Sequence, residues 1–285
     1  MNGVAAPIVT PFTESGDIDE EALRNLVGWL EDREVDFHVP CGSTSEAELM
    51  TLEERRSVTE IVVEEASLPV LAGAGHPGYR ETIEQIEGAT TAGAECVMIV
   101  TPFYYPHSQE ALAEYYREVA DAASVPVYLY SVPPFTDVIL EPETVGQLAD
   151  HPNIAGMKDS LGDLGAFIRT AQQTSDADFD LLTGSANLLK AARDHGGTGA
   201  ILALANLAPE EAKEGFEASD ESDRVDMGTL VELNRAITSS FGIPGLKWAM
   251  RERGAPSGYP RRPFRAPSEH AKSELSSLLG RANLI

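Results

Sequence analysis

Short apolar runs rich in Val, Ile and Leu alternate along this chain with amphipathic stretches of helical periodicity, and this alternation limits the possible folds most. Strands that are apolar throughout are typical of a parallel sheet covered by helices on both faces. We predict eight such strands, at residues 3–9, 35–41, 69–74, 96–101, 125–132, 153–158, 179–183 and 199–205. Eight strand–helix units favour an α/β fold of the (β/α)8, or TIM-barrel, type over an open sheet.

The last part of the chain has a different pattern, because only helical periodicity follows Pro209. Helices are predicted within residues 210–254 and at residues 268–279, with several prolines between them. We therefore predict two regions. Residues 1–209 form the (β/α)8 barrel, and residues 210–285 form a C-terminal helical appendage packed on the barrel.

The composition is strongly acidic, with 21 basic and 46 acidic residues and a net charge of −25. Such a field argues against nucleic acid and anionic membranes as partners. An acidic surface poor in lysine is typical of an organism with a salty cytoplasm, so we expect a halophilic protein. The sequence shows no apolar run of membrane-spanning length, no signal-peptide pattern and only two cysteines. We expect a soluble, cytoplasmic protein without a disulfide framework.

Lys158 ends the apolar run predicted as the sixth strand, and its position is hard to explain structurally. Burying an unpaired ammonium is costly, whereas a neutral amine is a nucleophile toward carbonyls. The alternative is a lysine that extends from the strand end to solvent. The other four lysines lie in helical contexts. Our hypothesis is that Lys158 forms a Schiff base with a 2-oxo acid.

Polar residues follow other predicted strands, at the end where a barrel of this type carries its active site. Tyr130 lies near the end of the fifth strand, Ser43 and Thr44 follow the second, and Gly184 follows the seventh. A phenol connected to hydroxyl groups can move protons for imine chemistry, and a glycine-led turn can hold a carboxylate. Tyr130 also fits a core aromatic, and Ser43 and Thr44 also fit helix caps. Their joint placement with Lys158 favours a catalytic rim.

Other motifs are weaker. Residues 73–78 match the G-x-G-x-x-G pattern, but Pro77 and the missing ribose-binding acid favour a plain turn between a strand and a helix. Cys41 has no visible His–Asn partnership, which favours a buried thiol. The histidines show no metal-binding spacing. We therefore expect no metal and no cofactor other than the covalent imine with Lys158.

The motifs together resemble the dihydrodipicolinate synthase/N-acetylneuraminate lyase family of class I, pyruvate-type aldolases. The resemblance runs from about residue 3 to residue 267. It is strongest at residues 42–46, Gly-Ser-Thr-Ser-Glu, where the family usually has Gly-Thr-Thr-Gly-Glu. Three later motifs, at residues 100–104, 130–133 and 156–160, also match. This resemblance implies a (β/α)8 barrel with C-terminal helices, usually assembled as a homotetramer.

The resemblance also implies roles for individual residues. Lys158 would form the Schiff base and Tyr130 would transfer protons. Ser43 and Thr44 would bind the carboxylate of the oxo acid and join the proton relay. Tyr104 matches a tyrosine that reaches a neighbouring subunit's site in some members, and Ile201 matches a position whose backbone carbonyl faces the ligand. We expect Gly184 and Phe135 to bind the substrate as well.

Phe135 is the departure that bears most on the substrate. Dihydrodipicolinate synthases carry an arginine at this position, two residues after the proline of the motif Tyr-Asn-Val-Pro. That arginine binds the carboxylate of the aldehyde substrate. A phenyl ring cannot form that charge-assisted pair. The site therefore resembles the 2-keto-3-deoxygluconate aldolases of archaea. The chain also resembles hydroxyoxoglutarate aldolases at Ser131 and at residues 151–154 and 241–247.

We therefore predict a class I lyase that cleaves 2-keto-3-deoxygluconate or its 6-phosphate to pyruvate and glyceraldehyde or its phosphate. The partners would be a small 2-oxo acid and an aldehyde. The alternatives are a 4-hydroxy-2-oxoglutarate aldolase, a 4-hydroxy-tetrahydrodipicolinate synthase, and a deoxy sugar acid dehydratase acting through the same imine. A non-catalytic oxo acid-binding protein is the alternative of another class.

Overall fold

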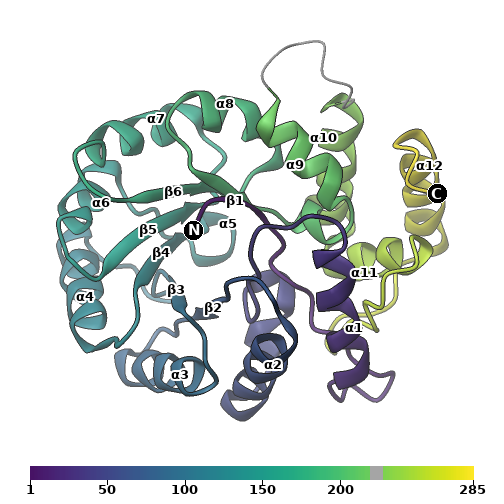
Figure 1. Cartoon of the computed structure of the whole chain (residues 1–285), viewed down its shortest axis with the longest axis horizontal. Coiled ribbons are helices and arrows are strands. Elements are labelled where there is room, and N and C mark those ends of the chain that lie inside the picture. Colours follow the sequence, from purple (N-terminus) through teal and green to yellow (C-terminus); the bar gives the residue numbers. More distant parts are fainter. Residues whose placement is uncertain (219–226) are drawn as a thin grey trace.

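A computed structural model describes residues 1–218 and 227–285, and in these residues parallel strands curl into a barrel (Figure 1). Seven strands pair in the order β1-β7-β6-β5-β4-β3-β2. Their bounds are β1 (Gly3–Ala5), β2 (Leu71–Ala74), β3 (Cys96–Val100), β4 (Val127–Ser131), β5 (Ile154–Asp159), β6 (Asp180–Thr183) and β7 (Gly199–Ile201). The predicted α/β barrel is confirmed.

The predicted strand at residues 35–41 fills the gap between β1 and β2, although it forms only isolated bridges. His38 pairs in parallel with Ala6 and with Val70, and the His38 N–H donates to the Pro69 carbonyl at 2.9 Å. A continuous ladder is interrupted because Pro40 has no N–H and the Asp36 carboxylate accepts the Val4 N–H at 2.7 Å. This segment supplies the eighth position and closes the (β/α)8 barrel.

Helices surround the strands, as Figure 1 shows. Thr51 and Glu54 form a capping box: the Glu54 N–H donates to the Thr51 hydroxyl, and the Thr51 N–H donates to the Glu54 carboxylate. The helices up to the end of the barrel are α1 (Glu20–Glu31), α2 (Leu52–Glu65), α3 (Tyr79–Thr91), α4 (Gln109–Ala122), α5 (Pro133–Thr136), α6 (Pro142–Ala149), α7 (Leu164–Gln173), α8 (Leu189–Asp194) and α9 (Pro209–Glu217).

The barrel has two apolar layers. The larger lies between the sheet and the helices, and the smaller fills the barrel interior with residues such as Leu71, Met98, Tyr128 and Leu182. Gly156 makes room for this packing, because a Cβ at that position would lie 2.6 Å from the Tyr128 ring. The filled interior leaves the rim at the carboxyl ends of the strands as the place for a site.

Beyond α9, the described residues form α10 (Met227–Arg235), the π-helical turn η5 (Ala236–Ser240), α11 (Gly242–Glu252) and α12 (Glu269–Arg281). Residues 219–226, within the helical stretch predicted at 210–254, lie outside the described residues. Helix α9 packs on β1 and α8, whereas α12 lies outside the ring of helices in Figure 1. A division of the chain after residue 209 stays a prediction. None of the described helices is long and apolar enough to cross a membrane.

Candidate active site

Tyr130 and Lys158 lie side by side in the barrel, because they are register partners on β4 and β5. The Lys158 ammonium nitrogen is 4.4 Å from the centroid of the Tyr130 ring, and both side chains are about 5% exposed. In the described residues, no carboxylate lies within ion-pair distance of Lys158. Asp159 points to the other face and accepts the Leu161 N–H at 2.8 Å. The amine therefore stands beside a phenol and without a counter-ion.

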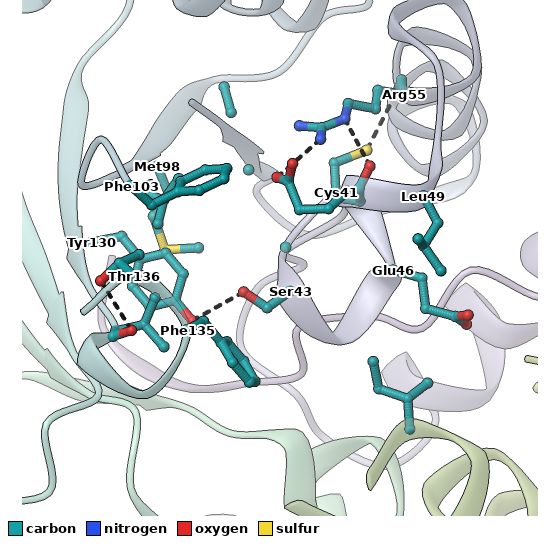
Figure 2. Close-up of a pocket in the computed structure, with 18 of the residues that line it drawn as sticks. Cys41, Ser43, Glu46, Leu49, Arg55, Met98, Phe103, Tyr130, Phe135 and Thr136 are labelled. Atoms are coloured by element: carbon teal, nitrogen blue, oxygen red, sulfur yellow. Dashed lines mark hydrogen bonds and ion pairs between the residues drawn. The ribbon is translucent and has the colours of Figure 1, made fainter. Parts of the chain in front are cut away.

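The turn after the bridged segment 35–41 brings a hydroxyl to the same rim. Ser43 begins the 3-10 helix η1 (Ser43–Ser45), and its Oγ lies 3.5 Å from the Tyr130 hydroxyl. Figure 2 shows these two side chains pointing toward each other. Thr44, the next residue, is partly buried but does not line the neighbouring cavity. The phenol thus has one hydroxyl neighbour at the limit of hydrogen-bond distance.

Ser45, which replaces the usual glycine of the Gly-Thr-Thr-Gly-Glu motif, stabilises the turn at residues 42–46 through two hydrogen bonds. It is buried, and its hydroxyl accepts the Gly42 N–H at 3.1 Å and donates to the Ile8 carbonyl at 2.5 Å. In the described chain, the N–H groups of Ser43 and Thr44 have no protein acceptor. The turn therefore keeps two N–H groups and the Ser43 hydroxyl available for an anion.

A cavity of about 260 Å³ opens beside Tyr130 and Ser43 (Figure 2). Its walls are mostly apolar and come from the strand ends, from α5 and from the C-terminal region, with Met98, Val100, Phe103, Val132, Phe135, Ile243, Pro263 and Phe264 among the lining residues. Arg55 is the basic residue of this lining, and its guanidinium donates to Glu48, to Gln85 and to the Ala47 carbonyl, each at 3.0 Å. No cation of the described lining is left unpaired.

The structure separates the other predicted site residues. Phe135, on α5, is 71% exposed and lines the cavity beside Tyr130. Tyr104 is 83% exposed, stacks edge-on against Tyr105 and lies outside the lining. Gly184 follows β6, and a Cβ there would overlap the Ser160 hydroxyl oxygen, so a larger residue would force Ser160 to move. Ile201 is buried at the end of β7 in the barrel interior. The cavity therefore brings together Ser43, Tyr130 and Phe135.

The sequence-based reasoning missed the contribution of the C-terminal region to the cavity. Ile243 belongs to α11, and Pro263 and Phe264 lie in the loop before α12. Ile243 lies within the residues 241–247 that resemble hydroxyoxoglutarate aldolases, but nothing in the local pattern of these apolar residues indicated a contact with the distant rim. Cys41 is buried beside the cavity, and its thiol donates to the Arg55 carbonyl. Burial raises the pKa of this thiol to about 11, which agrees with a buried thiol and argues against a nucleophile.

A (β/α)8 barrel with an unpaired lysine and a tyrosine at the carboxyl ends of neighbouring strands has the groups that a Schiff-base lyase needs. The chain belongs to the Dihydrodipicolinate synthetase family, whose family model matches residues 1–282. It is 33% identical over 283 residues to the 4-hydroxy-tetrahydrodipicolinate synthase of Methanothrix thermoacetophila, covering 98% of this chain and 96% of that protein. It is 34% identical over 291 residues to an uncharacterized DapA-like lyase of Halobacterium salinarum, covering 100% and 95%.

A solved structure agrees with this assignment. The dihydrodipicolinate synthase of Acinetobacter baumannii, solved in complex with pyruvate, has a TM-score of 0.94 at 28% identity, covering 100% of this chain and 99% of that one. The protein is therefore an enzyme of the lyase class with the class I aldolase fold. Its family reacts with pyruvate through a lysine imine and uses no separate cofactor.

Proposed function

We propose that this enzyme cleaves a 2-keto-3-deoxy sugar acid, 2-keto-3-deoxygluconate or its 6-phosphate, to pyruvate and glyceraldehyde or its phosphate. The Lys158 amine attacks the C2 carbonyl, and loss of water gives the imine. In the loss of water the Tyr130 phenol gives its proton to the departing hydroxyl, which leaves a protonated imine and a phenolate. The phenolate then accepts the proton of the C4 hydroxyl through the Ser43 hydroxyl while the C3–C4 bond breaks. The aldehyde leaves, the resulting enamine is protonated at C3, and water releases pyruvate from Lys158.

The observation that carries this proposal is the pairing of Tyr130 with an unpaired Lys158 on neighbouring strands. An imine needs a free amine and a nearby group that moves protons, and the pair supplies both. The turn with Ser43 and Thr44 would hold the carboxylate of the oxo acid through its free N–H groups and the Ser43 hydroxyl. Gly184 and Ile201 would complete the wall around the bound oxo acid.

The choice of the aldehyde rests on the cavity. Phe135 stands where a carboxylate-binding arginine would be needed, and Arg55 is already bonded to Glu48 and Gln85. A carboxylate placed against these apolar walls would lose its hydration without gaining a partner. The cavity therefore favours an aldehyde without a carboxylate.

A second candidate is 4-hydroxy-tetrahydrodipicolinate synthase, which condenses pyruvate with aspartate semialdehyde. It is favoured by the names of relatives at 33% and 36% identity, from Methanothrix thermoacetophila and Methanopyrus kandleri. The two candidates share the pyruvate imine and differ in the charge of the aldehyde. Initial rates with pyruvate and either D-glyceraldehyde, its 3-phosphate or aspartate semialdehyde separate them. A clear preference for aspartate semialdehyde would support the second candidate.

The imine itself is tested by reduction with borohydride in the presence of pyruvate, followed by intact-mass analysis and peptide mapping. We expect one pyruvyl adduct on Lys158, lost in Lys158→Ala. Lys190→Ala is the matched control, because Lys190 is a partly exposed lysine on α8 that pairs with Asp194. An adduct that persists in Lys158→Ala, or no adduct in the wild-type enzyme, would refute the proposal. The second result would favour a non-catalytic binding protein.

We also propose that the enzyme works as a homotetramer in a salty cytoplasm. Tyr104 and Tyr105 are large, exposed aromatic side chains on the loop after β3, where contact with a second subunit would cover them. The net charge of −25 supports adaptation to salt, because salt screens the repulsion among exposed carboxylates. Light scattering at about 0.1 and 3 M KCl would report the mass of the assembly, and a monomer at both salt concentrations would contradict this proposal.

A further inference from the structure

A buried ion pair joins the active-site turn to the C-terminal region. Glu46 ends the turn that begins with Gly42, and its Oε1 lies 2.5 Å from the Lys247 ammonium on α11, with both side chains fully buried. The ammonium also donates to the Thr10 carbonyl at 2.6 Å and to the Tyr259 carbonyl at 2.8 Å. Burial lowers the pKa of Lys247 to about 8, against the opposing effect of Glu46. The Glu46 carboxylate and the two carbonyl acceptors favour the charged form of this lysine.

The second carboxylate oxygen of Glu46 accepts the Arg261 N–H at 2.7 Å, so that two segments of the C-terminal region hold this one side chain. The backbone of Glu46 is left-handed, with a φ of 61°, which a residue with a Cβ rarely adopts. The Glu46 N–H donates to the Ser43 carbonyl at 3.1 Å. The contacts of the Glu46 carboxylate thus oppose the strain of a conformation that shapes the turn carrying Ser43.

A structural role alone explains this arrangement poorly. Replacing a buried ion pair by apolar side chains of similar size is often neutral for stability or even favourable. In some proteins a buried polar or ionic group fixes a single geometry among closely related arrangements. The pair is therefore better suited to fixing the position of the turn than to adding stability.

We propose that Glu46 and Lys247 are positioning residues, whose ion pair holds the turn with Ser43 and Thr44 in place to bind the carboxylate of the oxo acid. Neither side chain needs to touch the substrate. The C-terminal region then has a functional part beyond packing, because α11 sets the geometry of the rim from outside the barrel. This inference rests on the proposed function, since it presumes that an oxo acid binds at the turn.

The test compares Glu46→Gln and Lys247→Met with Lys213→Met as the matched control. Lys213 on α9 pairs with Asp36 at 2.7 Å, at the start of the segment 35–41 and therefore at the opposite end of the barrel. The readouts are the pyruvate concentration that gives half-maximal borohydride trapping, KM and kcat for the cleaved sugar acid, and the urea midpoint of unfolding. Lys247→Arg tests rescue by a conservative change.

We expect Glu46→Gln and Lys247→Met to raise the half-maximal pyruvate concentration and KM by about ten- to hundredfold, as displaced positioning groups do. Lys213→Met should leave the half-maximal pyruvate concentration and KM within about twofold of the wild-type values. This holds even if it lowers the urea midpoint as much as the two test variants do. Lys247→Arg should recover part of the loss. Folded Glu46→Gln and Lys247→Met enzymes with wild-type values would overturn the proposal, and so would the failure of both to fold, because the pair would then serve stability. A failure of the proposed imine chemistry differs, because the wild-type enzyme itself would then form no pyruvyl adduct. A different aldehyde partner would leave the trapping readout in place.

Discussion

Tyr130 and Lys158 face each other across two neighbouring parallel strands, with the Lys158 nitrogen 4.4 Å from the Tyr130 ring. Side chains of register partners in a parallel pair point to the same face of the sheet, and here that face is the barrel interior. The distance between amine and phenol is therefore set by the backbone ladder rather than by a mobile loop. Such a scaffold holds catalytic groups in a fixed relation.

Replacing Tyr130 by phenylalanine should lower kcat by about 10²- to 10³-fold, because the proton-transfer group is lost while the ring remains. The pyruvyl adduct should still form on long incubation, since Lys158 is unchanged. Steady-state kinetics and a time course of borohydride trapping measure the two effects.

Tyr128→Phe is the control for this change. Tyr128 lies two residues earlier on the same face, and its hydroxyl donates to Asp180 at 2.6 Å, away from the rim. It should leave kcat within about threefold. An equal loss in both variants would mean that Tyr130 acts through packing.

Replacing Phe135 by arginine should shift the preference toward aspartate semialdehyde. A charge-assisted pair with the aldehyde carboxylate contributes about 1.5–3 kcal/mol, so the ratio of kcat/KM values for aspartate semialdehyde and glyceraldehyde should rise at least about tenfold. Phe135 is largely exposed, so the longer side chain should fit. Phe135→Leu, which adds no charge, should leave the ratio unchanged. An unaltered ratio in Phe135→Arg would show that the aldehyde lies elsewhere.

Replacing Gly156 by alanine should destabilise the barrel by about 1–3 kcal/mol, because the added Cβ would lie 2.6 Å from the Tyr128 ring in a filled interior. Gly88→Ala is the matched control. Gly88 lies within α3, where an added Cβ meets nothing within 4 Å, so alanine should stabilise the protein by about 0.4–1 kcal/mol. Urea unfolding at constant salt measures both, and equal effects would contradict the crowding at Gly156.

Acid should weaken the fold through His38. Burial lowers the pKa of this histidine, against the opposing hydrogen bond to Glu31 at 3.0 Å. Between the lowered pKa and the ordinary value of 6.5, the unfolded chain binds more protons than the folded one, so stability falls as the pH drops through this window.

Urea midpoints from pH 7.5 to 5 should therefore depend less on pH in His38→Gln than in the wild-type protein. His270→Gln is the control, because His270 is exposed on α12 and should not alter this dependence. If His38→Gln keeps the wild-type slope, another group carries the acid sensitivity.

Much of the fold followed from local patterns. The apolar strands, the capping box at Thr51 and the position of Lys158 at a strand end were all readable, because burial on both faces and helix capping leave local signals. The extent of strand pairing at residues 35–41 was harder to predict, because Pro40 and the side chain of Asp36 shorten the pairing of this segment with its neighbours. The linkage of Glu46 to Lys247 left no signal, because each residue alone fits an ordinary turn or helix.

The sequence by itself determined the alternation of strands and helices, the lysine and tyrosine at the strand ends, and the missing arginine at Phe135, because these depend on residue type and short-range spacing. Only the tertiary structure decided that Tyr130 and Lys158 are register partners, that the cavity has no unpaired cation in its described lining, and that an ion pair joins Lys247 of α11 to Glu46. The physical reason is that register, cavity shape and buried ion pairs arise from contacts between residues distant in the chain, which local propensity does not encode.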